Sequence, residues 1–398
     1  MPLQNITVAI TGGIAAYKGC EFVRGLKKLG YNVHVAMTAE ATEFVTPLTF
    51  EALSGNPVAL TEWHQDGQTG MPHIQLNREA DLVIVIPATA NMLAKMAHGI
   101  ADDLVSTLLL ARRSPTVVVP AMNMYMWQNP ATQANVETLK KMGVLFWGPQ
   151  QGLQACGDVG EGRMLEVDDL LDLMGTVGQP PLLQGQSILL TAGPTYEPID
   201  DVRGITNLSS GKQGYALARA LRNLGATVTL VSGPVHLKTP AGVERFNVLT
   251  AQEMYDTVHQ LLDERDFQAF IGVAAVADWH IQGGALFGKR KKHAGEIPVL
   301  TLEENPDILA SVAQRPHAPL CVGFAAESED LERYARDKLQ KKKLRFVVAN
   351  LARNTLGAND NEVLIVDQTK TETIARSSKE LIAEAIAQRL AHELNSQH

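Results

Sequence analysis

The sequence predicts an α/β protein built of two doubly wound, Rossmann-like domains. An apolar run, a glycine-containing loop, a helix-like segment and a second apolar run follow one another over residues 6–37. The same order begins again over residues 187–233. The apolar runs are rich in Val and Ile and do not alternate with polar residues, which is typical of parallel strands buried on both faces. The repetition of this order, roughly one domain length apart, predicts two domains.

Composition limits the classes of function. The 398 residues are 45% hydrophobic and 20% charged, which is ordinary for a chain of two or three globular domains. The net charge of −8 argues against a general nucleic-acid binder. The first residues lack the basic and apolar regions of a secretory signal, and no apolar run approaches the length of a membrane span. We therefore expect a cytoplasmic protein that acts on small molecules, with no nucleic-acid or membrane partner.

Cysteine usage points to a reducing compartment. Cys20, Cys156 and Cys321 are too widely spaced for a zinc cluster, and their odd number does not suit a disulfide framework. Any cysteine that contributes to function would do so as a thiol.

The first half of the chain reads as alternating strands and helices. Strands are predicted at 6–10, 33–37, 82–86, 116–119 and 144–147, and helices at 14–29, 102–111, 130–142 and from about 167. Ligands of such sheets bind at the carboxyl ends of the strands. The small and polar loops after the first four strands therefore form one candidate rim: 11–14, Thr38, 87–91 and 120–123.

Single motifs in this half leave alternatives open. Gly12-Gly13 lacks a GxGxxG pattern, and a tight turn explains it equally well. A lone histidine such as His73 is more often structural than catalytic. The amide of Asn123, in a methionine-rich run, either braces the loop or binds a ligand. Cys156 lies in a glycine-rich stretch that reads as a mobile flap or as an ordinary surface loop.

Five motifs nevertheless occur together and in order: GGIAAYK, GMPHIQL, PATANM, PAMNMYMW and ACGDVGEGRM. Over residues 1–178 the chain thereby resembles the flavin-dependent cysteine decarboxylases, the family of phosphopantothenoylcysteine decarboxylase. The resemblance implies a flavodoxin-like fold with FMN bound at the strand-end loops. PATAN stands where the family usually has PASAN, and the threonine keeps the hydroxyl. The implied FMN contacts are Gly12, Gly13, Ile14, Thr38, Thr89 and Asn91.

The same resemblance implies three catalytic residues: His73, Asn123 and Cys156. In the implied reaction FMN first oxidises the substrate thiol, which makes loss of CO₂ possible, and later returns the electrons, so no external reductant is needed. His73 suits proton handling because the pKa of an imidazole lies near neutrality. Asn123 would hold the substrate carboxylate or amide by hydrogen bonds. Cys156, brought down by the flap, would supply a proton.

A linker and a second α/β domain follow. The segment 175–186 is rich in Gly, Pro and Gln and shows no periodicity, so we expect a first domain at 1–178, a linker at 179–186 and a second domain at 187–398. The second domain is predicted as a mostly parallel sheet with antiparallel strands towards its end. Its predicted strands are 188–190, 227–231, 269–273, 320–324, 346–349 and 363–366, and its helices are 211–224, 251–264, 305–314, 329–343 and 378–394.

Motifs in the second half also have ordinary explanations. SSGKQG is not a Walker A loop, since Gln213 stands where Ser or Thr should coordinate magnesium. The basic segment 288–295 is either a solvated loop or a polyphosphate contact, and Asp278, after an apolar strand, could hold magnesium. Pro306 suits the first turn of a helix, and the lysines of 338–343 suit a solvated helix face.

Together, TAGPTYEPIDDVRGITNLSSGKQG, AAVADW, KRKK, ENPDIL and GFAAES resemble phosphopantothenate-cysteine ligase over residues 187–397. The resemblance implies CTP as co-substrate, Mg²⁺ at Asp278 and a role for Asn207 in handling an acyl-cytidylate intermediate. The register of the lysine cluster leaves Lys289 open by a residue or two. The implied CTP contacts are Ala274, Ala275, Asp278, Lys289, Asn305, Pro306, Asp307, Ile308, Phe324, Lys338 and Lys342.

The two resemblances together imply a bifunctional enzyme of coenzyme A biosynthesis. It would join cysteine to 4′-phosphopantothenate with CTP and decarboxylate the product to 4′-phosphopantetheine. A nicotinamide dehydrogenase would also have nucleotide-type folds, but neither glycine loop has GxGxxG. A regulatory relative of the decarboxylase need not keep His73, Asn123 and Cys156 together. The resemblance further implies a homo-oligomer of decarboxylase trimers, up to a dodecamer, with ligase dimers.

Overall fold

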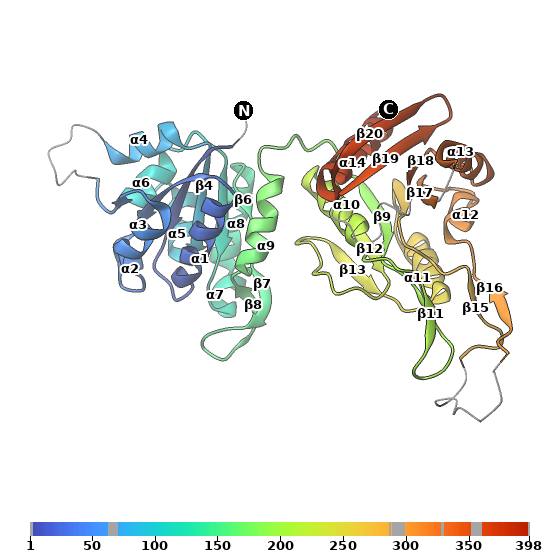
Figure 1. Cartoon of the computed structure of the whole chain (residues 1–398). Coiled ribbons are helices and arrows are strands. Elements are labelled where there is room, and N and C mark those ends of the chain that lie inside the picture. The colour runs from blue at the N-terminus through green and yellow to red at the C-terminus, as the bar shows by residue number, and fades with distance from the viewer. Residues whose placement is uncertain are drawn as a thin grey trace. The chain divides into compact units, whose positions relative to one another are not determined.

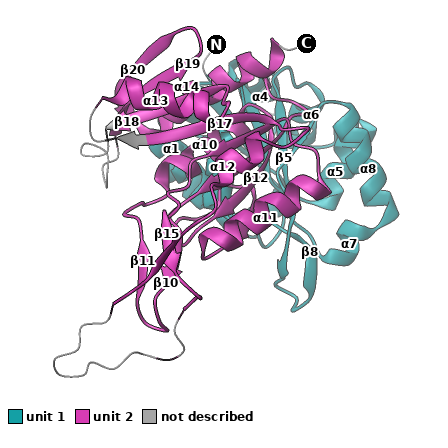
Figure 2. Cartoon of the chain, turned by 90° about the vertical axis from the view of Figure 1, so that its right-hand side faces the viewer, with its two compact units in different colours: residues 1–178 teal, residues 179–398 magenta. Residues whose placement is uncertain are grey.

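The computed structural model describes residues 3–62, 71–285, 288, 299–327, 330–351 and 360–396. The chain divides into two compact units, residues 1–178 and 179–398 (Figure 2). Both units are α/β, as the sequence predicts. Among the described residues, no helix combines the length and the apolar character needed to cross a membrane.

The first unit contains a six-stranded sheet in the order β3-β2-β1-β4-β5-β6, in which every neighbouring pair is parallel. The prediction of a doubly wound parallel sheet is therefore confirmed. Because β1 lies between β2 and β4, the strand order reverses at β1. The strands are β1 (Asn5–Ile10), β2 (Asn32–Met37), β3 (Val58–Ala59), β4 (Leu82–Ala88), β5 (Thr116–Pro120) and β6 (Leu145–Phe146).

Helices cover both faces of this sheet (Figure 1). On one face Ile84 of β4 belongs to the same buried cluster as Phe22 of α1, and on the other face Val85 clusters with Leu93 of α5. Burial on both faces explains why the strands show no polar alternation. The helices are α1 (Ala16–Lys28), α2 (Ala39–Thr42), α3 (Pro47–Ser54), α4 (Pro72–Glu79), α5 (Ala90–His98), α6 (Leu104–Leu110), α7 (Met124–Gln128), α8 (Pro130–Lys141), α9 (Val167–Leu173) and the 3₁₀ turn η1 (Met174–Thr176).

The glycine-rich stretch around Cys156 differs from the expected loop. It forms an antiparallel hairpin of β7 (Gln150–Leu153) and β8 (Val159–Arg163), with Cys156 in the connection. Glycines lower strand propensity, which hid the hairpin from a propensity argument.

The second unit contains an eight-stranded sheet in the order β13-β12-β9-β14-β17-β18-β19-β20. Its pairs are parallel from β13 to β18 and antiparallel from β18 to β20, so the predicted change of direction near the end is confirmed. The strand order reverses at β9, between β12 and β14. The strands are β9 (Ser187–Ala192), β12 (Thr227–Ser232), β13 (Glu244–Asn247), β14 (Ala269–Gly272), β17 (Leu320–Glu327), β18 (Phe346–Leu351), β19 (Asp360–Asp367) and β20 (Thr371–Ser378).

Helices α10 and α14 pack on one face of this sheet, and α11, α12 and α13 pack on the other (Figure 1). Two short ribbons, β10 (Tyr196–Pro198) with β11 (Gly204–Thr206) and β15 (Trp279–Ile281) with β16 (Leu302–Glu304), lie outside the main sheet. The helices are α10 (Lys212–Asn223), α11 (Ala251–Glu264), α12 (Ile308–Ala313), α13 (Leu331–Lys341) and α14 (Lys379–Asn395).

Two boundaries differ from the expected ones. Helix α12 begins at Ile308 rather than near 305, because the Asp307 side chain accepts the amide N–H of Ala310 and caps the helix. Leu183, in the expected linker, is fully buried in the core of the second unit, and its amide donates to the carbonyl of Leu224.

A buried ion network anchors the β19–β20 hairpin to α14. The Asp367 carboxylate accepts the amides of Thr369 and Lys370 at 2.7 and 2.8 Å and the Arg389 guanidinium at 2.7 Å. Arg389 also pairs with Glu393 at 2.6 Å. Burial alone would raise the pKa of Asp367, but these donors outweigh it and hold that pKa well below its usual range.

We predict that Asp367→Asn destabilises the β19–β20 and α14 region by about 1.5–3 kcal/mol near neutral pH, because it removes charge-assisted hydrogen bonds. The folded-state pKa of Asp367 is lowered, so its contribution is complete above its unfolded-state pKa of about 3.9 and fades as the pH falls below that value. The cost of the substitution should therefore shrink in acid. Hydrogen exchange of the β19 and α14 amides in the full-length protein measures it.

The matched control is Asp360→Asn, on the same hairpin, where Asp360 pairs with Arg376 and both side chains are exposed. This change should leave the exchange free energies unaltered, since exposed ion pairs contribute little. If Asp367→Asn cost as much free energy well below about pH 3.9 as at neutral pH, the prediction would be contradicted.

Candidate functional site

The carboxyl ends of β1 and β4 are tied together by threonines. The Thr11 hydroxyl donates to the carbonyl of Pro87 at 2.6 Å, and the Thr89 amide lies 3.4 Å from the same hydroxyl. Thr89 caps α5 by accepting the amide of Met92, and Thr38 caps α2 by accepting the amide of Ala41. Two of the expected FMN contacts thus also begin helices at this rim, where helix N-termini attract anions.

The glycine loop leaves an open surface beside these caps. A Cβ atom on Gly12 would lie 2.4 Å from Cβ of Glu40, so only glycine allows the loop to approach α2 this closely. A Cβ atom on Gly13 would make an ordinary contact of 3.7 Å with Thr89. The side chain of Ile14 is 63% exposed, and Asn91 is also exposed. The structure therefore gathers the predicted rim residues around one solvent-accessible edge.

Asn123 and Cys156 contact each other directly beside this edge, and both contact Asp158. The Asn123 amide donates to Sγ of Cys156 at 3.3 Å and to the Asp158 carboxylate at 2.8 Å. The Cys156 thiol lies 3.3 Å from the same carboxylate oxygen. Gln154 accepts the amide of Met124 at 3.0 Å, and the Met122 amide donates to the carbonyl of Gly162. These contacts fasten the β7–β8 hairpin to the loop that holds Asn123.

His73 is not part of this cluster within one chain. It lies near the start of α4, and Figure 1 shows α4 and the β7–β8 hairpin at opposite ends of the first unit. Its Nδ1 is buried and has no hydrogen-bond partner among the described residues. Among the described residues, the Asn77 side-chain amide donates to the backbone carbonyl of His73 at 3.0 Å.

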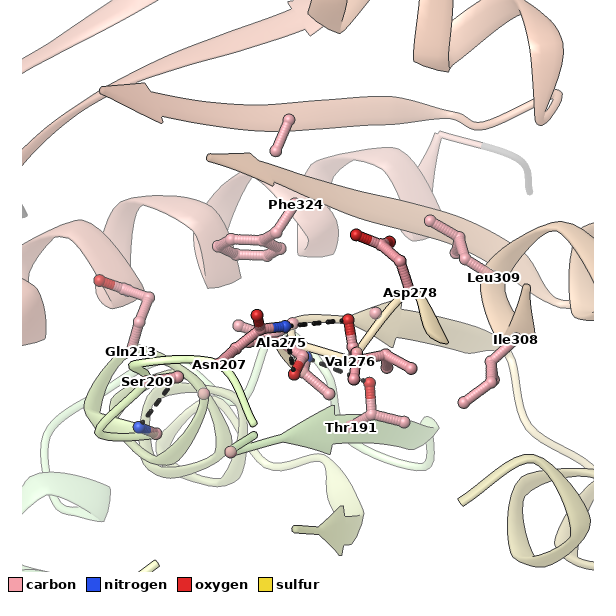
Figure 3. Close-up of a pocket in the computed structure, with 18 of the residues that line it drawn as sticks. Thr191, Asn207, Ser209, Gln213, Ala275, Val276, Asp278, Ile308, Leu309 and Phe324 are labelled. Atoms are coloured by element: carbon pink, nitrogen blue, oxygen red, sulfur yellow. Dashed lines mark hydrogen bonds between the residues drawn. The ribbon is translucent and has the colours of Figure 1, made fainter. Parts of the chain in front are cut away.

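The second unit contains a pocket of about 1140 Å³ where the strand order reverses. Ser209 and Gln213 lie on one side, Ile308 and Leu309 lie on the opposite side, and Asp278 and Asn207 lie between them (Figure 3). All the described residues that the sequence implied for CTP line this pocket, and so does Asn207. Lys289 lies outside the described residues.

Two neutral side-chain amides hold the backbone of residues 275–277, which we call the floor of the pocket. The Asn207 amide donates to the carbonyls of Ala275 and Val276 at 3.2 and 3.0 Å (Figure 3), and the Asn305 amide donates to the carbonyl of Ala277 at 2.8 Å. These bonds hold the loop that presents Asp278, which is exposed. The described residues contain no group of three or more His, Cys, Asp or Glu able to hold a metal, so a cation at Asp278 would need ligands from a bound nucleotide.

Charged contacts organise the side of the pocket near α12 and α13. The Lys342 ammonium pairs with Asp307 at 2.6 Å, and Lys338 donates to the carbonyl of Phe324 at 2.5 Å. Burial alone would raise the pKa of Asp307, but Lys342 and the amide of Ala310 outweigh it, and the pKa is lowered. Asp307 is therefore ionised at neutral pH, and its ion pair with Lys342 holds this side of the pocket in place.

Sequence reasoning missed several residues at both sites. Asp158 and Gln154 flank Cys156 in the flap motif, and the acidic residue directly after Cys-Gly was the available signal. In the second unit Lys212, Asn361 and Lys379 also line the pocket. Rejection of SSGKQG as a Walker A loop removed Lys212 from consideration, although the glycine before a helix remained a signal. Nothing in the sequence around Asn361 or Lys379 indicated a ligand site.

Two protein-family models match the chain in succession. The model described as Flavoprotein matches residues 1–177. The model described as DNA/pantothenate metabolism flavoprotein C-terminal domain matches residues 183–394.

Curated relatives match nearly the whole chain. The coenzyme A biosynthesis bifunctional protein CoaBC of Vibrio parahaemolyticus is 47% identical over 97% of this chain and 98% of its own length. The CoaBC protein of Escherichia coli is 45% identical over 96% and 95%. A solved structure of the C-terminal domain of a coenzyme A biosynthesis bifunctional protein CoaBC is 35% identical, with a TM-score of 0.47, and covers 54% of this chain and 99% of that chain. The chain therefore belongs to the family of coenzyme A biosynthesis bifunctional proteins.

Proposed function

We propose that this chain carries out two consecutive reactions of coenzyme A biosynthesis. The second unit ligates cysteine to 4′-phosphopantothenate with CTP, and the first unit decarboxylates the resulting phosphopantothenoylcysteine to 4′-phosphopantetheine. The observation that carries the proposal is the single pocket in which Asn207 and the described CTP residues come together. The substrates are small molecules, and we place the enzyme in the cytoplasm.

The ligase pocket suits activation of a carboxylate by a nucleotide. A carboxylate is a poor acyl donor, so CTP first converts it to a mixed anhydride with CMP, which the amine of cysteine then attacks. Asp278 would hold Mg²⁺ together with the triphosphate, and the lysines of the pocket would offset the phosphate charge. Asn207 lies beside Asp278 across the pinned 275–276 loop, where its amide can orient the acyl group without adding charge.

The rim of the first unit fits FMN. Gly12 lets the loop pack closely against α2, and the starts of α2 and α5 at Thr38 and Thr89 offer backbone N–H groups to a phosphate. Gly13, Ile14 and Asn91 complete the contacts. When bound, FMN supplies the two-electron oxidation and re-reduction that make loss of CO₂ possible.

The cluster of Asn123, Cys156 and Asp158 handles the substrate and a proton. Asn123 holds the substrate carboxylate or amide, and Cys156 delivers a proton to the decarboxylated product. Because the thiol lies against the Asp158 carboxylate, the carboxylate can accept the S–H hydrogen and orient it. The hairpin that carries Cys156 closes over the rim and excludes water.

His73 contributes to decarboxylation from a second copy of the chain. Its separation from Asn123 and Cys156 within one chain is the arrangement that a site shared between copies requires. We propose a homo-oligomer in which decarboxylase units form trimers, up to a dodecamer, and ligase units form dimers.

Mass spectrometry of the products tests both halves at once. The purified, as-isolated protein is incubated with 4′-phosphopantothenate, cysteine, CTP and Mg²⁺. We expect 4′-phosphopantetheine together with CMP and pyrophosphate. Accumulation of phosphopantothenoylcysteine would leave only the ligase half of the proposal standing, and absence of CMP would overturn that half.

We predict that Cys156→Ser still releases CO₂ but accumulates the oxidised, decarboxylated product, which lacks one pair of hydrogens relative to 4′-phosphopantetheine. The hydroxyl of serine is a much weaker acid than a thiol, so the final proton transfer fails. Mass spectrometry with supplied phosphopantothenoylcysteine measures the two products. Cys20→Ala, which changes another thiol of the same unit on α1, is the control and should yield 4′-phosphopantetheine. Normal output from Cys156→Ser would remove this thiol from the mechanism.

We predict that Asn207→Asp lowers the ligation rate by at least roughly tenfold while decarboxylation of supplied phosphopantothenoylcysteine is unchanged. The new carboxylate would face the carbonyls of Ala275 and Val276 without a hydrogen to donate, and it would repel the nucleotide phosphates. Release of CMP and of CO₂ measures the two rates. Asn247→Asp, the same change on the exposed strand β13, is the control and should leave both rates unaltered. An unaffected ligation rate in Asn207→Asp would exclude the proposed role.

A further inference from the structure

Four lysines line the pocket of the second unit, and they form two pairs with different surroundings. Lys338 donates to the carbonyl of Phe324, and Lys342 pairs with the carboxylate of Asp307. Lys212 and Lys379 lie close enough that Lys212 lowers the pKa of Lys379. The second pair therefore concentrates positive charge in one part of the pocket.

That part of the pocket is the start of α10, which we call the α10 end. It is lined by residues 209–214 together with Asn361 and Lys379, and Figure 3 shows Ser209 and Gln213 there, across the pocket from Ile308. Gly211 precedes α10 with a φ of 72°, and no side chain caps the helix. The twelve-residue helix thus directs its N-terminal dipole into the pocket.

Lys379 is buried at the α10 end. It is only 7% exposed, and no hydrogen bond or ion pair to its ammonium group occurs within the described part of the chain. Gln213 donates to its backbone carbonyl at 3.4 Å and so links the start of α10 to the start of α14. Burial is the main cause of the lowered pKa of Lys379 and Lys212 adds to it, whereas Glu380 and Asp360 act in the opposite direction. A buried ammonium in this position is stabilised best by an anion.

Asn361 supplies a second buried donor. Its pairing with Ser377 across the β19–β20 ladder brings it near Lys379, and it is 6% exposed. Its Oδ1 accepts the amide of Glu362 at 2.8 Å, so Nδ2 is the side-chain donor that this pocket-lining residue can offer a ligand. The Oε1 atom of Gln213 is also buried without a hydrogen-bond partner among the described residues, so the polar groups of the α10 end are incompletely satisfied.

We infer that Lys379, Lys212 and Asn361 form a seat for a phosphate group at the α10 end of the pocket. The inference rests on the proposed ligase function and assigns the seat to the terminal phosphates of CTP. The nucleoside would then lie near Ile308, and Asp278, the proposed Mg²⁺ ligand, lies between the two ends of the pocket (Figure 3). As the substrate carboxylate oxygen bonds to the α-phosphorus, the bond from that phosphorus to the bridging oxygen breaks, and its electron pair leaves on pyrophosphate. Lys379 and Lys212 stabilise the charge that develops there.

Binding measurements on the full-length protein with Mg²⁺ test the seat. We compare the wild type with Lys379→Met, which keeps the apolar stem, by calorimetric titration with CTP, CMP, pyrophosphate and 4′-phosphopantothenate. Loss of a charged hydrogen-bond donor should weaken CTP and pyrophosphate by roughly ten- to hundred-fold and leave CMP unchanged. Lys379→Arg should retain most of the affinity. Lys370→Met, at an exposed lysine of the neighbouring β19–β20 turn, should change nothing.

The pattern of affinities decides the outcome. If Lys379→Met weakens the binding of 4′-phosphopantothenate and leaves the affinity for CTP unchanged, the seat exists, but its occupant is the phosphate monoester of that substrate and not CTP. Equal weakening of CTP and CMP, or no weakening of any probe, would overturn it. Asn361→Asp gives a second test with little change of shape, since its carboxylate should repel the same phosphate and spare CMP. If the wild type binds no CTP, the proposed ligase function fails. The seat is then decided by whether the wild type binds pyrophosphate more tightly than Lys379→Met does.

Discussion

Both candidate sites depend on the reversal of strand order at the first strand of each sheet. Connections that leave β1 and β4, or β9 and β14, pass to opposite faces of the sheet, so the loops diverge and leave a crevice. Polar side chains then keep each crevice in shape. In the first unit the Thr11 hydroxyl bonds to the carbonyl of Pro87, and in the second the Thr195 hydroxyl accepts the amide of Ala277 at 2.9 Å. Topology thus creates the space, and short hydrogen bonds fix its edges.

The two sites use the polar groups around these crevices differently. In the first unit the groups are mostly hydroxyls, backbone amides and the cluster of Asn123, Cys156 and Asp158, of which the last two lie in the β7–β8 hairpin. A hairpin attached to its neighbouring loop by a few hydrogen bonds can open without disturbing the sheet, as a site that must exclude water during one step requires. In the second unit the side-chain amides of Asn207 and Asn305 hydrogen-bond directly to the backbone carbonyls of the pocket floor. A rigid floor suits a reaction that depends on alignment of phosphate and carboxylate.

The sequence predicted the main strands and helices because their periodicity is strong and their burial is nearly complete. It missed helices α3, α4 and α5, the two-residue strand β3 and the β7–β8 hairpin. Glycine and polar residues dominate the hairpin, and tertiary contacts decide its conformation. Family motifs identified the residues contiguous in sequence, such as 305–308. They did not identify Lys379, which reaches the pocket only because the β19–β20 hairpin returns the chain to the start of α10. The separation of His73 from Cys156 was likewise invisible, since spacing along a chain does not determine distance across a sheet.

Local charge, rather than net charge, governs what the second pocket can bind. The chain as a whole carries a net charge of −8, which would repel a triphosphate at long range. Within the pocket, Asp307 neutralises Lys342 and leaves that side suited to an uncharged base and ribose. The described residues that line the α10 end, namely 209–214, Asn361 and Lys379, include no carboxylate, and a helix N-terminus adds to the positive potential. Under the proposed function, a nucleotide would satisfy both ends only with its phosphates towards α10. This direction would bring the α-phosphate beside Asp278 and Asn207, where we propose that the carboxylate attacks.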